Sequence, residues 1–448
     1  MLLRLNISYL FIAALLYVYF LPSTESNFLF IYFLNILNFA IYFFTLYSSS
    51  QKKESYFSKH NLLITIAICS IFIVIFYNYI SVLYNNNFFV FSEADAVTYY
   101  KRGMIMASKP FLEGIKLYSN KMMVEDLGGV LITSFVFRFC ESVLVLNFFY
   151  IICGLLTAIS IYKICINFMS FKYAYICSLA YSLSSFVLWF HSSVLKETVM
   201  VMFLVMFFDQ YFQLVRKGSI GRLIYASGLL TGLMFFRPVL ILFCIASLIM
   251  GRFLQKKRGA TGIIVVLLGI VAIIVLYPSI DSMYARFFAS GDIDSMLMSK
   301  KEMIKGTLQF TYATNILAQA IGPLTTISPN FKTLLSFYSP GLVYKILLSF
   351  SFWLGVYYIF KLKVDFLYPL VFFVMIEMVS LISILEGLEL RKALPQFPFI
   401  YIIAFWFLYK YDFTNSIENK KRIKYLYGLY SVMVLAILFA WNFRFDKI

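Results

Sequence analysis

The chain has 448 residues, of which 62% are hydrophobic and 13% are charged, whereas a soluble domain carries about 25% charged residues. This composition excludes an ordinary soluble protein and indicates a membrane protein with several spans. The net charge is +17, but the basic residues punctuate apolar runs, as loop charges that set membrane topology do. We therefore expect membrane lipids around the chain and no nucleic acid as a partner.

Apolar runs near the length of a membrane span recur along the sequence and predict an all-α, polytopic protein with about 13 transmembrane helices. The expected spans are 6–21, 27–47, 61–84, 142–162, 173–190, 196–215, 222–236, 238–251, 260–277, 341–360, 365–385, 396–410 and 424–441. Two of these runs, 222–236 and 238–251, are short, so they form either a hairpin of half-depth helices or one broken span.

Basic residues gather in alternate loops of this pattern. They are Lys52, Lys53, Lys59, Lys163, Lys172, Arg216, Lys217, Arg222, Arg252, Lys256, Lys257, Arg258, Lys361, Lys363, Lys410, Lys420, Lys421, Arg422 and Lys424. Because positively charged loops stay in the cytoplasm, we expect the N-terminus inside and the C-terminus outside. No small-residue cleavage site follows the first apolar run, so we expect this run to be retained as a span.

This topology divides the chain into five parts. They are three N-terminal spans (1–84), a first long outer segment (85–141), a central bundle (142–277), a second long outer segment (278–340) and four C-terminal spans (341–448). Both outer segments mix aromatic, aliphatic and charged residues, which predicts interfacial helices. The short apolar stretch 128–140 is expected to be such a helix, and 278–340 a substrate-facing or lid segment.

The first outer segment begins with an acidic motif. Glu93 and Asp95 lie two residues apart, just after the third predicted span. A carboxylate in this position is suited to act as a general base or to hold a divalent cation such as Mg²⁺ or Mn²⁺. Arg102 follows seven residues after Asp95 as a candidate phosphate ligand. The alternative is a solvated loop, or a helix N-cap formed by Ser92 or Asp95.

A second polar group spans the turn between two central spans. We expect Ser192 or Ser193 to cap the following helix, with Lys196 and Glu197 in its first turn. A cation in the first turn opposes the helix dipole, and a bound anion would resolve this conflict. Lys196 and His191 are therefore candidate phosphate ligands. The alternative is an interfacial anchor with the lysine extended towards water.

Two further groups carry buried or clustered cations. Arg237 precedes Pro238 within apolar sequence, where an arginine costs at least about 2.5 kcal/mol unless it is paired or hydrated. It predicts either an anion site at a broken helix or the tip of a hairpin that reaches the headgroups. Arg391 and Lys392 lie in a short late loop, where an arginine can clamp a phosphate bidentately. The alternative is a solvated loop before a helix that starts with proline.

Cysteine and histidine point to no metal centre. The six cysteines lie in or beside apolar runs without a CxxC pair, which favours small buried side chains. Two histidines are too few for a histidine-rich zinc site, so any metal would take oxygen ligands.

Three motifs in order resemble the GT-C superfamily of multi-span glycosyltransferases. They are the acidic pair after an early span, Gly-Leu-Met-Phe-Phe-Arg-Pro at 232–238, and Arg-Lys-Ala-Leu-Pro-Gln-Phe-Pro at 391–398. The resemblance covers roughly residues 90–400 and is strongest to bacterial members that serve surface polysaccharides. The chain differs from that family by two additional spans before the acidic motif and by the lack of a large soluble C-terminal domain.

The resemblance implies a bacterial inner-membrane enzyme whose active site faces outward. Such an enzyme moves a sugar from a polyprenyl-phosphate-linked donor to a glycan or lipid-linked acceptor. By resemblance, Asp95 or Glu93 is the catalytic base or metal ligand, and Arg237, Arg391 or Lys196 holds the carrier phosphate.

Two other functions fit the same pattern. An O-antigen or capsule repeat-unit polymerase would rely on arginines such as Arg286 and Arg391, with Asp95 inert. A flippase or other transporter of lipid-linked oligosaccharides would have a basic central cavity that opens alternately to both sides.

Overall fold

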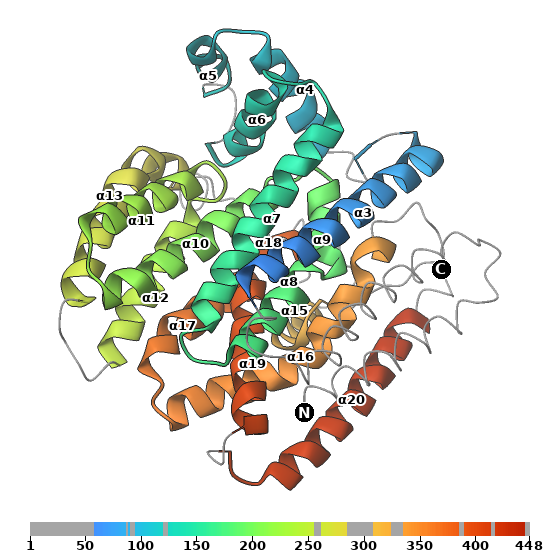
Figure 1. Ribbon diagram of the computed structural model, residues 1–448, viewed down its shortest axis with the longest axis vertical. Coiled ribbons are helices and arrows are strands. Elements are labelled where there is room, and N and C mark those ends of the chain that lie inside the picture. The colour runs from blue at the N-terminus through green and yellow to red at the C-terminus, as the bar shows by residue number, and fades with distance from the viewer. Residues whose placement is uncertain are drawn as a thin grey trace.

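The computed structural model describes residues 58–86, 88–89, 95–119, 124–254, 261–284, 308–323, 335–384, 389–413 and 417–443, and within these ranges the regular elements are all helices (Figure 1). The predicted all-α class is therefore confirmed for the described chain. The first two expected spans, 6–21 and 27–47, lie outside these residues, as do Glu93, Ser92 and Arg286.

The described helices follow one another along the chain. They are α3 (Lys59–Asn85), α4 (Asp95–Ala107), α5 (Phe111–Ser119), α6 (Val124–Phe137), α7 (Val143–Cys165), α8 (Phe171–Ser182), α9 (Ser185–Ser192), α10 (Glu197–Arg216), α11 (Ile220–Met234), α12 (Val239–Leu254), α13 (Thr261–Tyr284), α15 (Leu308–Ile321), α16 (Leu335–Lys361), α17 (Tyr368–Ser383), α18 (Leu390–Ala393), α19 (Phe397–Phe413) and α20 (Lys420–Phe443), with 3₁₀ turns η4 (Asp365–Leu367) and η5 (Leu394–Gln396).

Seven stretches of the described chain are helical, long and apolar enough to cross a membrane. They are Lys59–Leu83, Val143–Cys165, Glu197–Arg216, Pro340–Lys361, Asp365–Ser383, Leu390–Phe413 and Lys420–Trp441. These helices support a membrane protein, but they do not amount to the predicted number of about 13 spans. Within the described residues, the bent pair α8 and α9 adds an eighth span if it is counted as one.

The predicted span 173–190 is broken in the middle. Helices α8 and α9 meet at an angle of 50°, and Ser184 between them has an extended backbone. The Ser184 hydroxyl lies 2.7 Å from the carbonyl of Ala180 and 3.0 Å from the Tyr401 hydroxyl. A polar contact to a distant helix thus satisfies the groups at the break.

The break expected at Arg237 and Pro238 is confirmed. Helix α11 ends at Met234 after 15 residues, and α12 starts at Val239 and has 16. Both are shorter than the roughly 20 residues that a full span needs. The region 222–251 is therefore two short helices joined by a turn.

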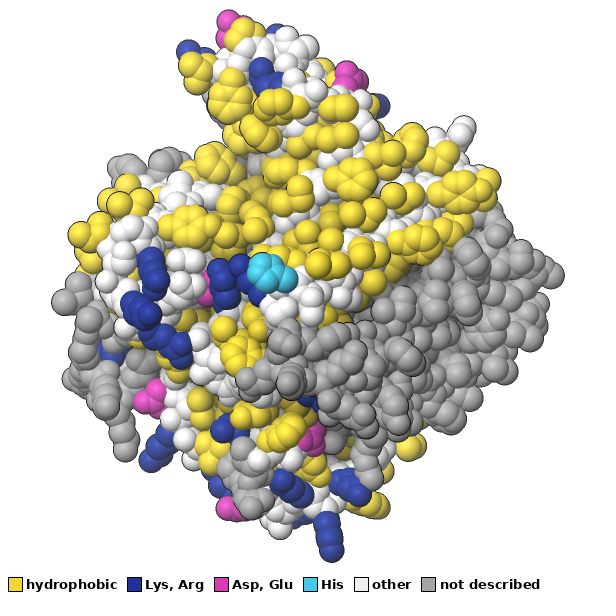
Figure 2. Space-filling model, viewed as in Figure 1, with side chains coloured by type: hydrophobic (Ala, Val, Ile, Leu, Met, Phe, Trp, Pro, Cys, Tyr) yellow, Lys and Arg dark blue, Asp and Glu magenta, His cyan; other side chains and the backbone are white. Residues whose placement is uncertain are grey.

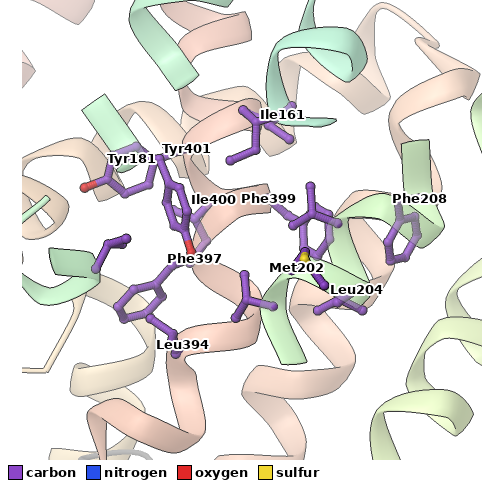
Figure 3. Close-up of a cluster of buried hydrophobic side chains, with 14 of the residues drawn as sticks. Ile161, Tyr181, Met202, Leu204, Phe208, Leu394, Phe397, Phe399, Ile400 and Tyr401 are labelled. Atoms are coloured by element: carbon purple, nitrogen blue, oxygen red, sulfur yellow. The ribbon is translucent and has the colours of Figure 1, made fainter. Parts of the chain in front are cut away.

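Helix α19 forms the centre of the bundle. Its residues from Phe397 to Leu408 are all buried, and aromatic rings of neighbouring helices pack against it (Figure 3). The ring centroids of Phe208 in α10 and Phe399 are 4.8 Å apart, and those of Tyr181 in α8 and Tyr401 are 5.7 Å apart. Both pairs are arranged edge to face. Such pairs add about 0.5–1.5 kcal/mol each beyond the area that they bury.

One end of the bundle gathers the basic loops. The Arg216 guanidinium at the end of α10 lies 5.1 Å from the Phe366 ring in η4. Lys361 at the end of α16 pairs with Glu418, just before α20, at 2.8 Å. Dark blue side chains collect in the lower half of Figure 2, whereas the surface above is mainly apolar. Loops that the sequence predicts on one side of the membrane therefore meet at one end of the fold.

Helices α4, α5 and α6 form a separate cap at the opposite end, at the top of Figure 1. Helices α4 and α6 pack closely at Gly103, where a Cβ would lie only 2.5 Å from Thr133 Cγ2. The predicted helix at 128–140 corresponds to α6. Its location at a membrane interface remains a prediction.

Candidate functional site

Arg391 joins three segments that are far apart in the sequence. Its Nη1 donates to Asp95 Oδ2 at 2.6 Å, while Nε and Nη2 donate to Glu197 Oε1 at 2.9 and 2.7 Å. The Glu197 side chain is 7% exposed, whereas those of Asp95 and Arg391 are 45% and 36% exposed. The guanidinium thus holds one buried carboxylate of the bundle and one accessible carboxylate of the cap.

The local structure favours the placement of these charges. Asp95 is the first residue of α4 and Glu197 is the first residue of α10. A carboxylate at a helix N-terminus is stabilised by the helix dipole. Arg391 comes from the short helix α18, immediately before the central helix α19. A helix therefore supports each of the three side chains.

A second ion pair lies beside the first. Lys196 Nζ donates to Asp126 Oδ1 of α6 at 2.7 Å, and the Tyr99 hydroxyl donates to the same oxygen at 3.3 Å. Burial raises the pKa of Tyr99, and the negative charges of Glu197, Asp126 and Asp95 raise it further. The phenol therefore stays protonated and remains a hydrogen-bond donor to Asp126. The charges of Asp95, Asp126 and Glu197 all act on it.

The turn before α10 differs from the prediction. Neither Ser192 nor Ser193 caps the helix, because the Ser192 hydroxyl donates to the Trp189 carbonyl and α10 has Lys196 at its N-cap without a side-chain cap. Val194 has a left-handed backbone with φ of 59°. That conformation turns the chain and directs Lys196 and Glu197 towards the cap, at an expected cost of about 1–3 kcal/mol.

Arg237 lies beside α18 in the turn between α11 and α12. Its Nη1 donates to the Lys392 carbonyl at 2.9 Å and is 4.0 Å from Glu377 Oε1. Glu377 belongs to α17 and is only 1% exposed. The Gly128 amide of α6 donates to the Phe235 carbonyl of the same turn at 2.9 Å. The arginine is thus paired within the protein, next to the contact between cap and bundle.

The predicted phosphate ligands are mostly engaged by carboxylates. Four cations, Lys196, Arg237, Arg391 and Lys392, face five carboxylates, Asp95, Asp126, Glu197, Glu377 and Glu389. Arg102 forms no ion pair with a described residue. An anion that binds at Lys196 or Arg391 therefore competes with a carboxylate of the chain.

His191, a predicted phosphate ligand, does not lie in this cluster of ion pairs. Its side chain is buried, and a Cβ at Gly154 would lie 2.4 Å from its Cε1. It lines a cavity of about 20 Å³ with Thr157 and Thr198. Among the described residues, neither His191 Nδ1 nor Thr198 Oγ1 has a hydrogen-bond partner. The cavity is large enough for one water molecule, which would satisfy both groups.

Four residues of the site escaped sequence reasoning. Asp126 and Tyr99 lie in the same outer segment as Asp95, and Glu197 was noted only as a neighbour of Lys196. Glu377 carried the clearest signal, because an ionisable residue inside a predicted span marks a functional or paired position.

Comparisons with family models, with curated proteins and with solved structures gave no match. The described residues contain no group of three or more side chains suited to hold a metal ion. Asp95 is the only predicted metal ligand among them, and Arg391 holds one of its oxygens. A Mg²⁺ or Mn²⁺ site with Glu93 therefore stays a prediction.

Proposed function

We propose that the protein is a membrane glycosyltransferase of the GT-C type in the bacterial inner membrane. It transfers a sugar from a polyprenyl-phosphate-linked donor to a glycan or lipid-linked acceptor on the outer face, in the synthesis of surface polysaccharide. The observation that carries the proposal is the convergence of Asp95 with Arg391 and Lys196 at the end of the bundle opposite the basic loops.

The residues supply both parts of the reaction. The Asp95 carboxylate accepts the proton of the acceptor hydroxyl, whose oxygen forms a bond to the anomeric carbon of the sugar. The bond from that carbon to the phosphate oxygen breaks, and the carrier phosphate leaves with the electron pair. Arg391 and Lys196 stabilise the negative charge that develops on it. The proton then passes from Asp95 to solvent.

The surroundings suit a donor with a lipid tail. The site lies where amphipathic helices of the cap meet long apolar helices, so a polyprenyl chain has an apolar surface to follow while its headgroup reaches the cations. The orientation with the cap outside follows the positive-inside pattern of the loops at the other end.

One observation favours a repeat-unit polymerase as the second candidate. Arg391 already holds Asp95, so the arginine is central to the site whereas the aspartate is partly neutralised. A polymerase that depends on arginines rather than on a carboxylate would have this arrangement.

The test is a comparison of Asp95→Asn with Glu113→Gln in the native host, at equal amounts of protein in the membrane. Glu113 is an exposed carboxylate of the same cap. Mass spectrometry of polyprenyl-linked sugars and of surface glycan gives the readout. Accumulation of a polyprenyl-linked donor sugar and loss of one sugar from the glycan, in Asp95→Asn alone, support the transferase. Accumulation of complete single repeat units in Arg391→Gln, with pools unchanged in Asp95→Asn, supports the polymerase, and unchanged pools in both variants contradict both functions of the site.

A further inference from the structure

We propose that Arg391 and Lys196 form a site for a diphosphate group, and that Asp95 and Asp126 of the cap occupy this site when no ligand is bound. The inference rests on the proposed function, because it specifies the carrier group that the same site takes.

The two carboxylates that occupy the site share three properties. Asp95 and Asp126 both come from the cap, each meets one cation of the bundle, and the distances are 2.6 and 2.7 Å. Their side chains are 45% and 42% exposed. Both carboxylates are open to solvent although Lys196 itself is only 11% exposed, so an anionic ligand can approach each pair and compete with the carboxylate for its cation.

The third carboxylate behaves differently. Glu197 belongs to α10 of the bundle, is 7% exposed and receives two hydrogen bonds from Arg391. It therefore stays in place and keeps the guanidinium oriented while the cap carboxylates leave.

Charge conservation selects the ligand class. Asp95 and Asp126 together place two negative charges on two cations that are held by neighbouring segments. A diphosphate diester carries one charge on each phosphate and replaces both carboxylates without changing the net charge of the site. A phosphate diester carries a single charge, so one of the two ion pairs would remain closed.

Replacement of Asp95 by a phosphate at Arg391 also affects the catalytic base. While the ion pair is closed, Asp95 Oδ2 is bound to the guanidinium of Arg391. A phosphate that takes over the guanidinium releases Asp95 at the moment when the donor is present. The ligand thereby activates the base that the reaction needs, and the empty enzyme is kept inactive.

The test measures binding to the purified full-length protein in lipid nanodiscs by calorimetry. The matched probes are citronellyl methyl diphosphate and citronellyl methyl phosphate, which differ by one phosphate. We expect the wild type to prefer the diphosphate. Lys196→Met should weaken its binding at least about tenfold and abolish the preference. Asp126→Asn should bind it about threefold more tightly or better, because a competitor is removed.

Asp95→Asn provides a second, independent variant with the same expected increase in affinity. Unchanged or weaker binding in both aspartate variants, or equal binding of the two probes by the wild type, overturns the proposal. Inorganic pyrophosphate distinguishes the source of the group, since weaker binding than the diester indicates a lipid-borne ligand and equal binding indicates a free diphosphate. Because binding and not transfer is measured, failure here is distinct from failure of the glycan profile that tests the proposed function.

Discussion

Replacing Arg391 perturbs two ion pairs at once, because its guanidinium holds the buried Glu197 and the accessible Asp95. The perturbation is Arg391→Gln, combined in one double-mutant cycle with Glu197→Gln and in a second with Asp95→Asn. Glutamine and asparagine keep the size of the carboxylates and remove their charge. The two cycles therefore compare the same guanidinium against a buried and an accessible partner.

The structure sets the magnitude for each cycle. Removing one partner of a fully buried pair costs about 3–5 kcal/mol. Because the Arg391 side chain is 36% exposed, water compensates part of the loss, and we expect Arg391→Gln to lower the free energy of unfolding by about 2 kcal/mol. The coupling to Glu197 should be about 1.5–2 kcal/mol, and the coupling to the 45% exposed Asp95 should stay below about 1 kcal/mol.

The buried cysteines provide the assay. Cys153, Cys165, Cys177 and Cys244 are buried, whereas Cys140 is exposed. In a Cys140→Ser background, unfolding in mixed micelles with increasing SDS makes these thiols reactive towards a fluorogenic maleimide. The dependence of labelling on the SDS concentration gives the free energy of unfolding of each variant in the two cycles. A coupling to Asp95 as large as that to Glu197, or no coupling to either residue, would refute the argument that Arg391 is anchored by Glu197.

Three further predictions concern the cap, the buried histidine and the response to pH. Gly128→Ala should destabilise the protein by about 1–3 kcal/mol, because the new Cβ would lie 2.5 Å from the Phe235 carbonyl oxygen. The control is Gly228→Ala, whose new Cβ would meet no neighbouring atom within 4 Å. It should be neutral or stabilising in the same SDS titration. Gly154→Ala should displace the His191 ring, and His191→Ala in the same chain should recover most of the lost stability; no recovery would show that the clash lies elsewhere. The pKa of Tyr99 is raised in the folded protein, so the folded state keeps a proton that the unfolded chain loses above about pH 10, and stability falls as the pH rises. Tyr99→Phe should make that fall shallower by up to about 1.4 kcal/mol per pH unit between pH 10 and 11, and an identical pH dependence would contradict the raised pKa.

The seven described helices that are long and apolar enough to span a membrane were predictable because apolar length alone defines them. The expected span 424–441 corresponds to α20 at Lys420–Phe443, and 142–162 corresponds to α7 at Val143–Cys165. The break in 173–190 was not predictable, because Ser184 finds its partner Tyr401 on a helix that is 217 positions away. No local pattern in the sequence records that contact.

The site was predicted as separate residues and not as an arrangement. Asp95, Lys196 and Arg391 were singled out because charges are rare in an apolar chain. Their connection spans 296 positions between Asp95 and Arg391, and helix spacing carries no information at that range. Asp126 was overlooked because a carboxylate in a polar segment is ordinary until its cation is known.

The most direct measurement of the central claim is transfer by the purified protein. Polyprenyl-linked sugars that accumulate in cells lacking the protein are extracted, returned to vesicles with the purified chain and the acceptor fraction, and followed by mass spectrometry. We predict that the wild type and Glu113→Gln release the sugar from the carrier and attach it to the acceptor, whereas Asp95→Asn and Arg391→Gln do not. Unaltered donor with the wild type, or equal turnover by Asp95→Asn, would contradict a transferase that acts through this site.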